Sequence, residues 1–128
     1  MNNTNITSTF KLEPMGRCSV KSHYGRAQVC VYGNTGVYGL LSYGYLVAAG
    51  TMANFGAPGQ LFRIWCESFE YGYGGWSKTT AKHLESFAAF LGAEYGGKKS
   101  WTDKEYKTIE EVIALVEGGN DQPTPKAA

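Results

Sequence analysis

Alternating apolar and polar positions near the start of the chain predict two β-strands. The residues at 17–21 and at 26–32 both alternate with a period of two. This period is typical of a strand with one buried face. Gly25 lies between the two runs and suits a tight reversal. We therefore expect an antiparallel hairpin here. The pattern does not identify the edge strands of the sheet, but an exposed edge such as the strand at 26–32 could pair with itself or with a target.

The most apolar stretch of the chain lies between residues 37 and 49 and predicts one or two central strands. A buried helix has a similar apolar pattern. Gly39 and Gly44 within the stretch argue against a helix and indicate a bulge or a close backbone approach. A turn at 33–36 precedes the stretch, and a further strand is expected at 61–66 after an intervening loop.

Residues 79–91 have the 3.6-residue period of an amphipathic helix. Ser77 or Thr79 can cap its first turn, and Gly92 suits its end. The expected apolar face consists of Ala81, Leu84, Phe87, Ala88 and Leu91.

A second helix has two possible starts. Thr102 with Glu105 forms one capping box and Thr108 with Glu111 forms another. The expected apolar face is the same for both and consists of Ile109, Val112, Ile113 and Val116. Gly118 and the glycine after it are expected to end this helix.

These elements predict an α+β fold. We expect an antiparallel sheet of about four to six strands, with helices near 79–91 and 108–117 forming one layer on it. Residues 1–9 are expected to be a flexible N-terminus, residues 10–118 a single domain and residues 119–128 a disordered tail.

Composition narrows the classes of function. The 128 residues carry a net charge of +1, with a pI near 7.7. Nucleic-acid-binding domains usually have a pI above about 9, so charge is not the expected principle of recognition. The 3 cysteines are widely spaced, and the chain has neither an apolar run long enough for a membrane span nor a signal-peptide pattern. We expect a cytoplasmic protein without a membrane partner.

No motif predicts a metal, a cofactor or a catalytic group. The cysteines lack C-x-x-C spacing and the two histidines are not four residues apart, so we expect neither a metal site nor a cofactor. His83 could pair with Cys30, Cys66 or Ser77, but no catalytic signature surrounds them. We expect His83 to border the apolar face of its helix and the protein not to be an enzyme. A small His83-dependent hydrolase is the third hypothesis.

A small nucleic-acid-binding accessory protein is the second hypothesis. It rests on two groups of basic residues, with Tyr24 and Trp101 nearby to stack on bases. The contacts it predicts are Arg17, Lys21, Arg26, Lys98 and Lys99. Neighbouring acidic residues balance these charges.

Aromatic residues set among glycines support the favoured hypothesis, a non-enzymatic protein that binds another protein. Tyrosine offers a large contact area at low entropic cost, and glycine adapts the backbone around it. The predicted partner-binding residues are Tyr71, Tyr73, Trp76, Phe69 and Tyr38. Tyr43 or Tyr45 is expected to pack against the sheet instead.

Residues 41–48 and 76–87 resemble a pattern in small proteins of bacteriophages and mobile elements. In that pattern a Ser-Tyr…Val-Ala strand precedes a helix that begins Trp-Ser-x-Thr-Thr-x-Lys-His. The helix segment matches, whereas Gly44 and Tyr45 depart from the strand pattern. The resemblance implies a phage-type origin and a small fold of sheet and helix. Phage proteins of this size often inhibit host defence, and anti-CRISPR proteins are one example. The expected partner is therefore a host protein or a protein–RNA defence complex, and self-association is a further expectation.

Overall fold

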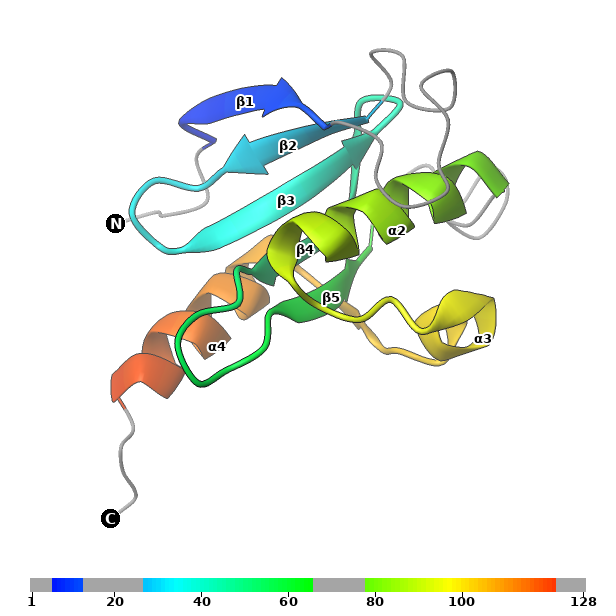
Figure 1. The fold of residues 1–128 in the computed structure, drawn as a ribbon. Helices are drawn as coiled ribbons and strands as arrows, with labels where there is room; N and C mark the ends of the chain where they lie inside the picture. The colour runs from blue at the N-terminus through cyan, green and yellow to red at the C-terminus, as the bar shows by residue number, and fades with distance from the viewer. Residues whose placement is uncertain (1–5, 13–26, 66–77, 122–128) are drawn as a thin grey trace.

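The computed structural model describes residues 6–12, 27–65 and 78–121. These residues form a six-stranded sheet and three helices (Figure 1). The strands are β1 (Ser8–Lys11), β2 (Ala27–Val31), β3 (Val37–Ser42), β4 (Tyr45–Thr51), β5 (Gln60–Ile64) and β6 (Tyr106–Lys107). The helices are α2 (Lys78–Leu91), α3 (Gly97–Thr102) and α4 (Ile109–Asp121). Regular structure thus extends slightly beyond both expected limits of the 10–118 domain.

The strands follow one another across the sheet in chain order. Strands β1 to β5 are antiparallel to their neighbours, and β6 runs parallel to β5. The predicted α+β fold is confirmed, with a third, short helix, α3, that the sequence pattern did not reveal.

Strand β2 lies inside the sheet. Val29 is opposite Phe10 of β1 on one side and opposite Leu40 of β3 on the other. The predicted hairpin between 17–21 and 26–32 is therefore wrong. The strand at 26–32, which was considered as a possible exposed edge, has a neighbour on each side. Residues 17–21 lie outside the described part of the chain. The alternating pattern reports which face a residue occupies but does not identify its partner strand.

The apolar stretch 37–49 forms two strands, β3 and β4, as the glycines indicated. The register between them shifts at Leu40 and Leu41, opposite Val47, which marks a β-bulge. Gly39 allows a close approach, because a Cβ there would lie 2.7 Å from the Sγ atom of Cys30. Gly44 instead belongs to the turn between the strands.

The sheet is covered on both faces. Helix α2 packs Leu84, Phe87 and Leu91 against a core that includes Val29 and Leu40. Helix α4 packs against a second core on the opposite face (Figure 1). This second core consists of Cys30, Tyr32, Val37, Ala49, Ile64, Val112 and Ile113.

The expectation that both helices form one layer is therefore wrong. Val29 and Cys30 are consecutive, point to opposite faces and are both fully buried. A strand buried on both faces needs cover on both sides.

Helix α2 ends as predicted at Gly92, which has a φ of +73°. The amide of Gly92 donates to Ala89 and that of Ala93 to Ala88, which is the Schellman arrangement. The last carbonyls are also used. Leu91 O accepts from the amide of Ala53 at 2.6 Å, and Gly92 O accepts from Gly59 at 3.1 Å. The loop between β4 and β5 is thus bonded to the end of α2.

The start of α4 is settled by the Thr108–Glu111 capping box. The Thr108 amide donates to Glu111 Oε1 at 2.8 Å, and the Glu111 amide donates to Thr108 Oγ1 at 3.1 Å. Thr102 instead ends α3. The predicted end at Gly118 is wrong, because α4 continues to Asp121. Glycine permits a helix stop but does not impose one.

Arg63 of β5 holds the segment between α3 and β6. Its Nη1 donates to the carbonyls of Thr102 and Lys104, at 2.9 and 3.2 Å, and its Nη2 donates to Tyr106 Oη at 2.7 Å. The guanidinium also lies 4.0 Å from the centre of the Tyr106 ring. These contacts fix β6 beside β5.

We expect Phe87→Ala to lower the free energy of unfolding by about 3–5 kcal/mol, because the ring is fully buried between α2 and the sheet. Urea denaturation followed by circular dichroism measures the change. The matched control is Ala89→Ser on the exposed side of α2, with an expected change within about 0.5 kcal/mol. An unchanged midpoint for Phe87→Ala would contradict the packing of α2.

Candidate functional site

The turn between β3 and β4 places two tyrosines at one end of the sheet. Its central residues are Tyr43, with a φ of 54°, and Gly44, with a φ of 83°. Two positive values define a type I′ hairpin turn. Tyr43 is the one non-glycine residue with a positive φ in the described part of the chain. This conformation costs an L-residue about 1–2 kcal/mol.

A buried polar network connects this turn to α2. Ser42 Oγ lies 2.8 Å from His83 Nδ1 and 3.3 Å from Thr80 Oγ1. Ser42 is 3% exposed and His83 is 0% exposed. The ring of Tyr43 lies over this network, with its centroid 5.8 Å from that of His83. The network fixes the turn against the first half of the helix.

Three exposed aromatic residues lie at this end of the sheet, and we call them the aromatic end. They are Tyr43, Tyr45 and Trp65, which are 49%, 51% and 47% exposed. Tyr45 begins β4 and Trp65 follows β5, and the antiparallel pairing of these strands brings them to the same end. Tyr43 was expected, as an alternative to Tyr45, to pack against the sheet, but it lies in the turn and its ring packs over His83 of α2. Both tyrosines remain about half exposed.

The flanking residues of the two undescribed internal segments also lie at the aromatic end. Leu12 donates its amide to Ala27 O, and Ala27 is opposite Ser42. Trp65 and Lys78 flank the segment 66–77. The four flanking residues, Leu12, Ala27, Trp65 and Lys78, therefore all lie at the aromatic end.

Of the predicted partner-binding residues, the structure describes Tyr38 alone. Tyr38 lies toward the other end of the sheet, half-buried, with its ring centroid 5.5 Å from that of Phe90. Phe69, Tyr71, Tyr73 and Trp76 lie outside the described residues. Trp65 was missed because the pattern placed it within a strand, with no signal that β5 ends one residue earlier.

The predicted nucleic-acid contacts are only partly described. Arg17, Lys21 and Arg26 lie outside the described residues, as does Tyr24. Lys98 and Lys99 lie exposed on α3, and Lys99 Nζ pairs with Asp103 Oδ2 at 3.0 Å. Trp101 cannot stack on a base as proposed, because it is buried against the core beneath α2.

Of the predicted catalytic partners of His83, the structure describes Cys30 alone. Cys30 faces the α4 core, and Cys66 and Ser77 lie outside the described residues. His83 was expected to border the apolar face and to be partly buried. Its side chain is instead completely buried. The pattern missed its partner Ser42, which is distant in sequence. In the described ranges, no group of three or more His, Cys, Asp or Glu side chains is placed to hold a metal ion.

Cys30 and Tyr32 form a titratable pair within the α4 core. Burial raises the pKa of the Cys30 thiol above its usual value. Burial also raises the pKa of the Tyr32 phenol, and its contact with Cys30 adds to the shift. The fold therefore keeps both groups protonated and tolerates their anions poorly.

We expect the free energy of unfolding to fall as the pH rises above about 8.5. The pKa values of Cys30 and Tyr32 are raised in the folded state, so the unfolded chain releases these two protons at a lower pH than the folded protein does. Each group then contributes a loss of up to about 1.4 kcal/mol per pH unit. Urea titrations at neutral pH and near pH 10 measure the decline, which should be smaller in Cys30→Ala. The control Ala89→Ser, a non-ionisable change on the exposed side of α2, should decline like the wild type. An equal decline in Cys30→Ala would contradict this assignment.

We expect Ser42→Ala to lower the free energy of unfolding by about 1–3 kcal/mol, because it removes the buried hydroxyl bonded to His83. Thermal and urea unfolding measure this loss. Ser100→Ala on the exposed side of α3 is the matched control, with a change within about 0.5 kcal/mol. A stability equal to the wild type would show that the network does not hold the turn.

Comparison with known proteins identifies the family of the chain but no activity. No helix in the described ranges has both the length and the apolar character needed to cross a membrane. No curated protein and no solved structure matches the chain. One family model matches residues 10–106, which is more than half of the chain. The chain therefore belongs to DUF8033, a family of unknown function.

Proposed function

We propose that this protein is a non-enzymatic binding protein that holds a partner protein at its aromatic end. The observation that carries the proposal is Tyr43, a half-exposed tyrosine held in a left-handed conformation over a buried polar network. Such strain persists only where the surrounding structure enforces it, and it is concentrated at functional sites.

The chemistry of the aromatic end suits a protein surface. Tyrosine and tryptophan supply most of the binding energy in protein interfaces. The I′ turn already restricts the backbone of Tyr43, so less entropy is lost when a partner binds. Tyr43, Tyr45 and Trp65 carry no charge, whereas binding to nucleic acid depends on cations that neutralise phosphates. A protein partner is therefore favoured over nucleic acid.

The resemblance to phage proteins extends the proposal to the kind of partner. The residues Thr79, Thr80, Lys82 and His83 of the Trp-Ser-x-Thr-Thr-x-Lys-His sequence lie in the first half of α2, which supports Tyr43. We propose a phage-type inhibitor that acts on a host defence protein or a protein–RNA defence complex, as anti-CRISPR proteins do. Its place of action is then the bacterial cytoplasm. This extension rests on the resemblance alone.

We expect a tagged protein to capture a host protein from bacterial lysate, and the double variant Tyr43→Gly/Tyr45→Thr to lose that capture. Glycine accepts the positive φ at position 43, so the turn is kept while the ring is removed. Mass spectrometry of the captured proteins and a circular dichroism melt are the measurements. The control is Phe55→Ser, an exposed aromatic at the opposite end of α2, which should capture normally.

Full capture by the folded double variant would contradict the proposal. A triple variant of Tyr71, Tyr73 and Trp76 to alanine tests the aromatic residues predicted from sequence in the same assay. Capture of DNA or RNA that falls steeply with salt would favour the accessory nucleic-acid-binding role instead.

A hydrolase is the second candidate function, because Ser42 Oγ and His83 Nδ1 lie at hydrogen-bond distance. Their burial favours a structural role, since a nucleophile must reach its substrate. An assay with a small activated ester separates the two. Hydrolysis that disappears in folded His83→Asn and Ser42→Ala variants would support catalysis.

A further inference from the structure

The loop between β4 and β5 exposes a phenylalanine completely. Asn54 and Ala57 exchange two backbone hydrogen bonds of 3.0 Å, so Phe55 and Gly56 form the tip of a tight turn. The side chain of Phe55 is fully exposed. Single exposed apolar residues are common, but a phenylalanine at the tip of a rigid turn is a suitable interface residue.

This tip is firmly held. The amides of Ala53 and Gly59 donate to the C-terminal carbonyls of α2, on either side of the turn. Pro58 restricts the backbone between them. Phe55 is thus presented by a structured loop, so little further ordering is needed when the ring is buried.

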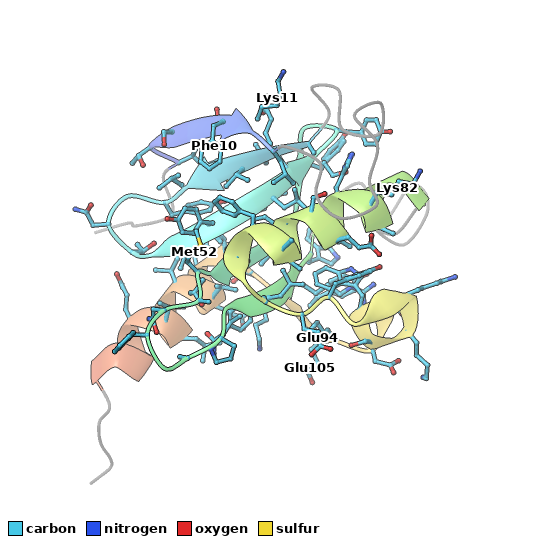
Figure 2. All side chains as sticks on the ribbon, viewed as in Figure 1. Phe10, Lys11, Met52, Lys82, Glu94 and Glu105 are labelled. Carbon is cyan, nitrogen blue, oxygen red and sulfur yellow. The ribbon has the colours of Figure 1, made fainter. Side chains whose placement is uncertain are left out.

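A groove of about 630 Å³ lies beside this turn. The turn forms one wall, and the exposed turn between β2 and β3 and the helix α4 form the others. The lining is mixed. It includes the apolar side chains of Met52, Pro58, Leu115 and Val116, the ring of Tyr38, and the polar residues Thr35, Thr51, Asn54 and Gln60. Figure 2 shows Met52 near α4, at the end of α2 that lies away from Lys82. Met52 and Leu115 are both exposed in the single chain.

Neither the groove nor the turn carries charge. Apart from the phenol of Tyr38, none of the described residues that line the groove is ionisable. The ten residues from Thr51 to Gln60 contain no Asp, Glu, Lys, Arg or His. Two identical copies of this surface can therefore meet without repulsion between like charges.

We propose that the protein forms a symmetric dimer in which each copy inserts Phe55 into the groove of the other. A projecting ring and a groove side by side on one surface are self-complementary under a two-fold rotation, which makes both contacts at once and closes the assembly. This proposal is independent of the aromatic end, which lies at the opposite end of α2 and stays free in the dimer.

The size of the contact indicates a weak dimer. Each aromatic ring buries about 150–250 Å², whereas a standard interface buries about 800 Å² on each partner. Met52, Leu115 and the turn itself must supply the rest of the area. Association should therefore depend strongly on concentration.

Sedimentation velocity over a micromolar to millimolar concentration series tests the dimer. The wild type should rise from the 14.0 kDa mass of one chain toward twice that value. Phe55→Ser should raise the dissociation constant by about 100-fold or more, because it removes the central aromatic contact twice. Tyr45→Ser is the matched control, an exposed aromatic at the other end, and should dimerise like the wild type. Melting temperatures confirm that each variant is folded.

A complementation experiment identifies the contact itself. Leu115→Glu places a charge in the groove that receives Phe55, so it should also abolish association. A mixture of Phe55→Ser and Leu115→Glu keeps one intact ring-in-groove contact, so the two variants should associate at least about tenfold more tightly with each other than with themselves. A wild type that stays monomeric at every concentration would overturn the proposal. A dimer unaffected by Phe55→Ser, or a mixture without preference, would also overturn it.

Discussion

Helix α2 is fixed to the sheet at both of its ends and along its length, and the surface features of the molecule depend on this. At its start, Thr80 and His83 bond to Ser42 in a buried network. At its end, the carbonyls of Leu91 and Gly92 accept amides from the β4–β5 loop. Between the ends, apolar side chains fill the core. Apolar packing alone tolerates small shifts along a helix axis, whereas directional hydrogen bonds at two separated points specify one position.

This constraint connects the two proposed binding surfaces. The network under Tyr43 and the bonds behind Phe55 both use groups of the same helix, at opposite ends. Each exposed ring is therefore held by a turn that is itself bonded to α2. A disturbance of the helix would change how both turns are presented. The two surfaces nevertheless share no residue, so a partner protein and a second copy can bind at the same time.

Local pattern in the sequence was sufficient to predict α2, its glycine end and the α+β class, because each depends on neighbouring residues. Capping signals gave two starts for the last helix, and the structure distinguishes them, because Thr108 and Glu111 form the capping box of α4 whereas Thr102 ends α3. The partners of β2 and the face covered by α4 were predicted wrongly, since alternation says nothing about distant segments. For the site, the sequence directed attention to other aromatic residues, Tyr71, Tyr73 and Trp76, and Tyr43 or Tyr45 was expected to pack against the sheet. The strained turn at Tyr43 and the exposure of Trp65 follow from chain reversal and strand ends, which leave little signal in sequence.

The parallel pairing of β6 has a consequence for the edge of the sheet. Strands β2 to β5 are joined by short turns and can assemble by successive local hairpins, which form quickly. Strand β6 consists of two residues that pair with β5 across an interval containing both α2 and α3. So short a strand has little stability of its own. Its place beside β5 therefore depends on the Arg63 contacts that hold the segment between α3 and β6. Without β6, strand β5 would be an unpaired edge of the sheet, open to pairing with another chain.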